Sequence, residues 1–200
     1  MTYEILIGLA VFALVSSLTP GPNNLMLMAS GANFGFRRSV PHMLGVAIGF
    51  TVMVLLVGLG LMQVFRAYPV SFQVLKVVSV VYLVYLAWRI GTAAPAEDEL
   101  SAEGRPLTFV QAALFQWVNP KAWTMALTAV SVYSPSHSVV AIGFVAAVFG
   151  AINLPCISLW TSAGQQLAAV LQSPRRLRVF NRVMAVLLLA SLYPVLLGEF

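Results

Sequence analysis

The sequence predicts an all-α integral membrane protein of six transmembrane helices, built as two inverted three-helix repeats whose first helices are broken at proline. Of its 200 residues, 60% are hydrophobic and 8% are charged, which is more apolar surface than a soluble chain can bury. The apolar residues form six runs, and a spanning helix needs roughly 20 residues. Two of the runs contain a polar interruption with proline. The runs fall at 4–34, 39–65, 70–91, 107–133, 138–171 and 179–198.

The first interruption is the segment 19–24, TPGPNN, inside the run 4–34. Pro20 and Pro22 each remove a backbone donor, and Gly21 permits conformations that other residues avoid. A break exposed to lipid would leave backbone N–H and C=O groups unpaired, so we expect it to line an enclosed cavity. The freed carbonyls suit an ammonium, and the new helix N-terminus at Asn23 suits a carboxylate. A zwitterionic amino acid presents both groups.

The second interruption, 118–121 (VNPK), lies in the run 107–133 and contains Lys121, the one basic residue placed near mid-membrane. A lysine at a helix centre costs roughly 2.5–3.5 kcal/mol on insertion. We expect its ammonium to meet an anionic group such as a substrate carboxylate; the alternative is snorkelling to the headgroups.

Two breaks at matching places in the two halves indicate a transporter's substrate site, whereas a single break would indicate a structural kink. The break in the fifth run, at Asn153, Pro155 and Cys156, is weaker, and there we expect a packing role, with a contribution of Asn153 to the cavity as the alternative. The candidate substrate-binding residues are Pro20, Gly21, Pro22, Asn23, Asn24, Asn119, Pro120 and Lys121.

Three spans in each half make the second half enter from the opposite face, so a repeat must be inverted. Aligning Pro20 with Pro120 places residues 13–14 on 113–114, both Ala-Leu, and VAIGF recurs at 46–50 and 140–144. The third spans show no convincing match. We expect a single transmembrane domain with repeat one at 1–92, an acidic cytoplasmic linker at 93–106 and repeat two at 107–200.

Orientation follows from the basic residues of the short loops. The side opposite the first, third and fifth loops holds Arg66 and Lys76. The more basic side should be cytoplasmic, which places both termini outside. Its arginines are Arg37, Arg38, Arg89, Arg105, Arg175, Arg176, Arg178 and Arg182.

No acidic residue lies deep in a predicted span, so a proton-relay carboxylate is missing. Proton coupling would fall to His42, Lys121, the substrate's own ionisation or water. His42, beside Pro41 at the start of the second span, is a candidate proton-sensitive gate or else an interfacial residue. The single cysteine excludes an intramolecular disulfide, and the two histidines begin spans on opposite faces, so we expect no metal or other cofactor.

The 19–24 motif, the segment 35–38 (GFRR) and the motif 119–121 (NPK) together resemble the lysine exporter/homoserine–threonine resistance (LysE/RhtB) superfamily of amino-acid efflux permeases, over essentially the whole chain. The double asparagine and the Gly-Phe-Arg segment look most like its cysteine/O-acetylserine-exporting branch. The resemblance implies export of small amino acids across the bacterial inner membrane, driven by the proton-motive force through alternating access. The candidate residues would then line or shape the transport path.

Two other classes stay open on the residues alone. A small integral-membrane transferase would gather reactive groups at one face, and residues 37–42 offer a poor set for that chemistry. A structural subunit of a membrane complex would tolerate substitution of both proline breaks. For the transporter we expect an amino-acid substrate and membrane lipids as partners, with a homodimer as one arrangement the chain allows, and no nucleic acid.

Overall fold

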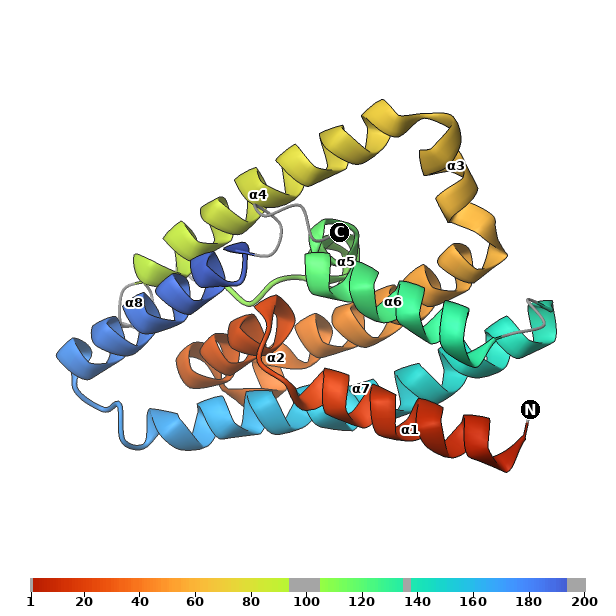
Figure 1. The fold of residues 1–200 in the computed structure, drawn as a ribbon. Coiled ribbons are helices and arrows are strands. Elements are labelled where there is room, and N and C mark those ends of the chain that lie inside the picture. Colours follow the sequence, from red (N-terminus) through yellow and green to blue (C-terminus); the bar gives the residue numbers. More distant parts are fainter. Residues whose placement is uncertain (1, 94–104, 135–137, 194–200) are drawn as a thin grey trace.

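The computed structural model describes residues 2–93, 105–134 and 138–193, and within these ranges every regular element is a helix. The chain folds into one elongated bundle, with α1 running from one end to the middle (Figure 1). The acidic linker is largely outside the described residues, as is His137. In chain order the elements are α1 (Tyr3–Leu18), α2 (Pro22–Leu56), the π-helical turn η1 (Val57–Leu61), α3 (Met62–Ala67), α4 (Pro69–Gly91), α5 (Phe109–Val118), α6 (Pro120–Tyr133), α7 (Val139–Ala168) and α8 (Pro174–Ala190).

Both predicted proline breaks are confirmed. α1 ends at Leu18, Thr19 and Gly21 are extended, and α2 begins at Pro22. In the second half, α5 ends at Val118 and α6 begins at Pro120. Proline is well placed at the first position of a helix, because the N–H that it lacks would have no helical partner there. Each break therefore ends one helix and starts the next.

The loop expected between the first two runs, with Arg37 in it, is replaced by a kink inside α2. Gly35 alone leaves helical geometry, at φ 79° and ψ 167°, a left-handed region that favours glycine. The side-chain oxygen of Gln165 in α7 accepts a hydrogen bond from the backbone N–H of Phe36 at 2.5 Å. A full loop was expected because the arginines interrupt the apolar pattern, but one glycine suffices to reverse the chain (Figure 1).

The closest helix packing is between the two halves of the chain, where α2 crosses α7. A β-carbon on Gly31 would collide with the backbone oxygen of Thr161, and one on Gly164 with the backbone oxygen of Met28. Small residues of this kind let helix backbones touch. Other pairs also join the halves, among them α1 on α7, α5 on α2, and α4 on α8.

Gly45 and Gly49 bring α2 close to α5. A β-carbon on Gly45 would lie 2.4 Å from the backbone oxygen of Phe109, and one on Gly49 would lie 2.6 Å from Cα of Ala113. Gly143, by contrast, has no described atom within 4 Å of its β-carbon position. Two glycines spaced four residues apart on one helix face therefore serve this helix contact, whereas Gly143 serves none.

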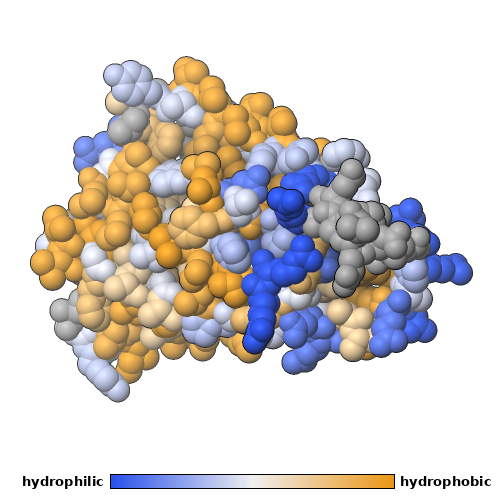
Figure 2. Space-filling model, turned by 180° about the vertical axis from the view of Figure 1, so that it is seen from behind, coloured by the Kyte–Doolittle hydropathy of each residue, from blue (hydrophilic) through white to orange (hydrophobic). Residues whose placement is uncertain are grey.

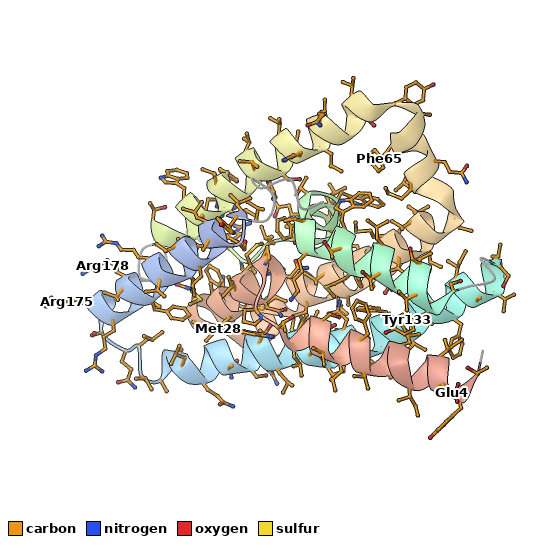
Figure 3. All side chains as sticks on the ribbon, in the orientation of Figure 1. Glu4, Met28, Phe65, Tyr133, Arg175 and Arg178 are labelled. Carbon is orange, nitrogen blue, oxygen red and sulfur yellow. The ribbon has the colours of Figure 1, made fainter. Side chains whose placement is uncertain are left out.

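Within the described residues, three helical stretches are long and apolar enough to cross a membrane, and α1 and α5 are shorter apolar helices. The three stretches are Pro22–Leu61, Gln73–Gly91 and Val139–Ala168. Apolar side chains cover much of the surface, and hydrophilic ones gather toward one end (Figure 2). Arg175 and Arg178 lie at one end of the bundle, and Glu4 and Tyr133 at the other (Figure 3). The arginines of the fifth predicted loop thus lie at the opposite end of the bundle from the start of α1.

Candidate functional site

The two breaks meet near the middle of the bundle, where the side chain of Lys121 reaches from α6 to the break after α1. Its ammonium nitrogen lies 2.6 Å from the backbone oxygen of Thr19, 2.9 Å from the Thr19 hydroxyl and 3.3 Å from the backbone oxygen of Pro20. An ammonium has three donors, so these three oxygens satisfy it. We expected the Lys121 ammonium to contact an anionic group. In this structure its three acceptors are two carbonyl oxygens and a hydroxyl, which are all neutral.

The break supplies those oxygens because proline interrupts the helical hydrogen bonds. Pro20 has no N–H for the backbone oxygen of Ser16, and the Thr19 hydroxyl donates to that oxygen instead, at 2.9 Å. The Asn24 amide donates to the backbone oxygens of Ser17 and Thr19, each at 2.8 Å. The side chains of Thr19 and Asn24 therefore fix the conformation of the break, and the Pro20 carbonyl oxygen accepts its hydrogen bond from Lys121.

A second contact joins the same two regions through amide side chains. Asn23 donates to Gln116 at 2.8 Å, and Gln116 donates back at 3.2 Å. Gln116 is fully buried and also donates to the backbone oxygen of Ala112 at 2.8 Å. The Asn119 side chain caps α6 by accepting from the backbone N–H of Lys121 at 3.2 Å. The start of α2 is thus tied to the end of α5.

A cavity of about 20 Å³ lies between these contacts. This is room for about one water molecule, far less than the roughly 300 Å³ or more of ordinary ligand pockets. The site is therefore closed in this state, and an amino acid enters only when the helices around it move. The residues lining it are Ser16, Ser17, Gly21, Asn23, Asn24, Phe50, Asn119, Lys121, Ala122, Met125, Asn153 and Ile157.

The cavity lining includes a polar group without a partner. Among the described residues, the hydroxyl oxygen of Ser17 is buried and has no hydrogen-bond partner. A buried polar group without a partner is costly, so it marks a place where a ligand or water binds. Asn153, which is 5% exposed, lines the same cavity, as the second of its two expected roles requires. The weak break expected beside it is wrong, because α7 continues through Pro155.

Of the predicted site residues, Gly21, Asn23, Asn24, Asn119 and Lys121 line the cavity. The three prolines act through the backbone. Pro22 and Pro120 start α2 and α6, and Pro20 contributes its carbonyl oxygen.

His42 lies elsewhere. It sits in the second arm of α2, is 2% exposed and does not line the cavity, and neither of its ring nitrogens has a partner. A gating role for it therefore stays a prediction. Gln116 and Ser17 were missed by sequence reasoning, because a single polar residue in an apolar helix gives no pattern by itself.

The chain was compared with known proteins. The sequence model of the family described as LysE type translocator matches residues 14–191. Similar curated relatives include the cysteine/O-acetylserine efflux proteins of Escherichia coli and Shigella flexneri. Each is 29% identical over 193 residues, covering 94% of this chain and 95% of the relative. No solved structure matches the chain.

Proposed function

The chain belongs to the LysE type translocator family, and from this premise we propose that it exports small amino acids or their close derivatives from the cytoplasm. Family membership makes it a transporter and not an enzyme, which sets the transferase alternative aside. It is a multi-pass protein of the inner membrane, with apolar helices long enough to cross a bilayer.

The observation that carries the proposal is the meeting of two broken helices at one closed polar cavity. The carbonyls of Thr19 and Pro20 offer acceptors for a substrate ammonium. The N-terminal ends of α2 and α6 both border the cavity, through Asn23 and Ala122, and helix N-termini favour a carboxylate. A zwitterion needs both kinds of partner within a few ångströms. Lys121 lines the cavity and is hydrogen-bonded to these carbonyls, so the two breaks bring both kinds of partner close to it.

Two polar side chains of the cavity favour a substrate with a polar side chain. The Ser17 hydroxyl, which is buried without a partner among the described residues, and the Asn153 amide line the cavity together with the apolar side chains of Met125 and Ile157. Cysteine and O-acetylserine, which the similar relatives are named for exporting, are small and carry a thiol or an ester. We propose this class of substrate, with serine-like amino acids as the nearest competitors.

The way the helices pair supports two inverted repeats and alternating access. The helices of repeat one (1–92) pack on helices of repeat two (107–200) in corresponding pairs. α1 packs on α7 in the same way as α5 packs on α2, and α4 packs on α8. A two-fold relation between the repeats produces this set of pairs, and such repeats alternate access to a central site by rocking. The site at the two breaks would open first to one face and then to the other.

Orientation and assembly extend the proposal. Arg175 and Arg178 lie at one end of the bundle (Figure 3). By the rule that basic loops stay inside, this end faces the cytoplasm in the proposed orientation, and both termini lie outside. Anionic headgroups are the natural neighbours of these arginines. A homodimer remains a prediction of the sequence.

The proposal is tested by feeding cells a panel of amino acids as dipeptides and following amino-acid release by mass spectrometry. Cells that make this chain should release one or a few small polar amino acids faster than cells that make its Asn119→Leu variant. Asn119 caps α6 and lines the cavity, so its loss should distort the site. Equal release across the panel, with both proteins present in the membrane, would overturn the proposed function.

A further inference from the structure

The most informative unexplained feature of the site is that Lys121 is bound in the way a ligand would be. Its ammonium reaches oxygens 101 and 102 positions away in the sequence, and all three belong to the break after α1. The carbonyl oxygen of Pro20 has no other hydrogen bond within the described residues. Oxygens freed by a helix break, with a cation seated on them, form a cation site.

Among the described residues that line the cavity, none carries a carboxylate to balance this charge, and Lys121 is the one ionisable side chain. The described elements packed against α6 carry few other titratable groups, and none of them lines the cavity. The groups are Tyr3 and Glu4 in α1, Arg37, Arg38 and His42 in α2, and Cys156 in α7.

We infer that the Lys121 ammonium occupies the place of the substrate's own ammonium, so that a proton on Lys121 and a bound substrate exclude each other. This inference rests on the proposed function. Two ammonium groups on one set of carbonyls would repel strongly at such short range. The cavity of about 20 Å³ also has no room for a substrate while the lysine side chain fills the site.

Mutual exclusion gives a transport cycle whose protons balance. On the cytoplasmic side the substrate zwitterion displaces the lysine, which loses its proton to the cytoplasm as the neutral amine moves aside. The loaded carrier opens outward and releases the zwitterion. The amine then takes a proton from outside, returns to the Thr19 and Pro20 oxygens, and the carrier closes and turns inward. Each cycle exports one zwitterion and imports one proton, and no intramembrane carboxylate is required.

The experiment distinguishes the effect of the proton on Lys121 from the effect of the length and shape of its side chain. Purified protein is placed in liposomes with an acidic interior, and uptake of labelled, reduced cysteine is compared with exchange of cysteine at equal pH. Two variants are measured beside the wild type. Lys121→Met keeps a chain of similar length without a proton, and Lys121→Arg keeps a charge that is never lost.

The wild type should accumulate cysteine under the pH gradient and exchange it without one. Lys121→Met should exchange cysteine at a lower but measurable rate, because the cavity has changed shape, and its accumulation should fall to the level measured without a gradient. Lys121→Arg should lose both activities, because the guanidinium keeps the oxygens occupied. If the lysine only ties two helices together, Lys121→Arg keeps both activities and Lys121→Met loses both, and the inference is overturned.

A measurement on the unaltered protein guards against a variant that fails to fold. Adding cysteine to the wild type in weakly buffered detergent solution should release about one proton for each cysteine bound, since each binding event displaces one proton from Lys121. Binding without proton release overturns the inference and leaves the proposed function intact. A wild type that neither binds nor moves any amino acid of the panel overturns the proposed function, and the inference with it.

Discussion

Asn23 and Gln116, 93 positions apart, exchange a reciprocal pair of hydrogen bonds across the boundary between the two breaks. The pair joins the first turn of α2 to the last turn of α5. Because an amide has one donor group and one acceptor, only an amide opposite another amide satisfies both in this way. The contact fixes the distance between the two sides of the cavity.

Removing either amide should destabilise the protein, and removing both should cost less than the sum. Gln116→Ala should lower the free energy of unfolding by about 1–3 kcal/mol, because Asn23 is left unpaired. The coupling energy between Asn23→Ala and Gln116→Ala should be about 0.6–1.7 kcal/mol, the range found for such bonds in membranes. A double-mutant cycle from unfolding in detergent measures it; strictly additive losses would show that the pair contributes nothing.

Gly21→Ala should impair transport without unfolding the protein. Its β-carbon would lie 2.5 Å from Cδ of Lys121, and a lysine side chain can move aside only by leaving its oxygens. We expect transport to fall several-fold with little change in melting temperature. Gly143→Ala is the matched control, since its β-carbon meets nothing within 4 Å. Normal cysteine efflux from Gly21→Ala would mean that the close approach is dispensable.

Gly31→Ala and Gly164→Ala should show the opposite pattern, a loss of stability. Here the colliding atoms are backbone oxygens, of Thr161 and Met28, which have no side-chain freedom to yield. Overpacking of this kind costs about 1–3 kcal/mol. Thermal unfolding in detergent should give a lower melting temperature for both variants than for Gly143→Ala, and unchanged melting would contradict the contact between α2 and α7.

Ser17→Ala should leave stability unchanged or slightly raised, because it removes a buried hydroxyl that has no partner. It should nevertheless weaken the binding of small polar substrates if the hydroxyl contacts them. Ser134→Ala is the control, since Ser134 is likewise buried without a partner but lies outside the cavity lining. Competition of unlabelled amino acids against cysteine transport reports the selectivity. Identical profiles for the two variants would remove Ser17 from the site.

The lone cysteine makes the orientation simple to check. In a Cys156→Ser background, Tyr3→Cys and Gln172→Cys place one exposed thiol near each end of the bundle. A thiol reagent that cannot cross the membrane should label Tyr3→Cys in intact cells, and Gln172→Cys only after the cells are opened. The reverse labelling pattern would show that the termini lie inside.

Residues 19–24 and 119–121 were predictable because proline and glycine act locally. Pro20, Pro22 and Pro120 decide by their own covalent structure where a helix ends or begins, and the structure places all of them at such boundaries. The placement of Lys121 among polar residues followed from the same reasoning. The oxygens that Lys121 contacts could not be predicted in this way, because a side chain as long as that of lysine can reach many different groups.

The other features of the site could not be predicted, because they depend on packing between distant parts of the chain. Gln116 and Ser17 are isolated polar residues in apolar helices, and only the three-dimensional arrangement shows that one faces Asn23 and the other faces the cavity. The kink at Gly35 was read as a loop because its neighbouring arginines look solvated. The structure shows instead that the side-chain oxygen of Gln165, 129 positions later, accepts a hydrogen bond from the backbone N–H of Phe36, the residue after the kink.

The small volume of the closed cavity has a consequence for the cell that carries the protein. A membrane protein with an open polar path would let water and ions pass and would run down the potential across the membrane. Here the polar break is filled by the protein's own lysine, with room left for about one water molecule. We therefore expect the resting protein to add no measurable ion conductance to the membrane, even when many copies are present.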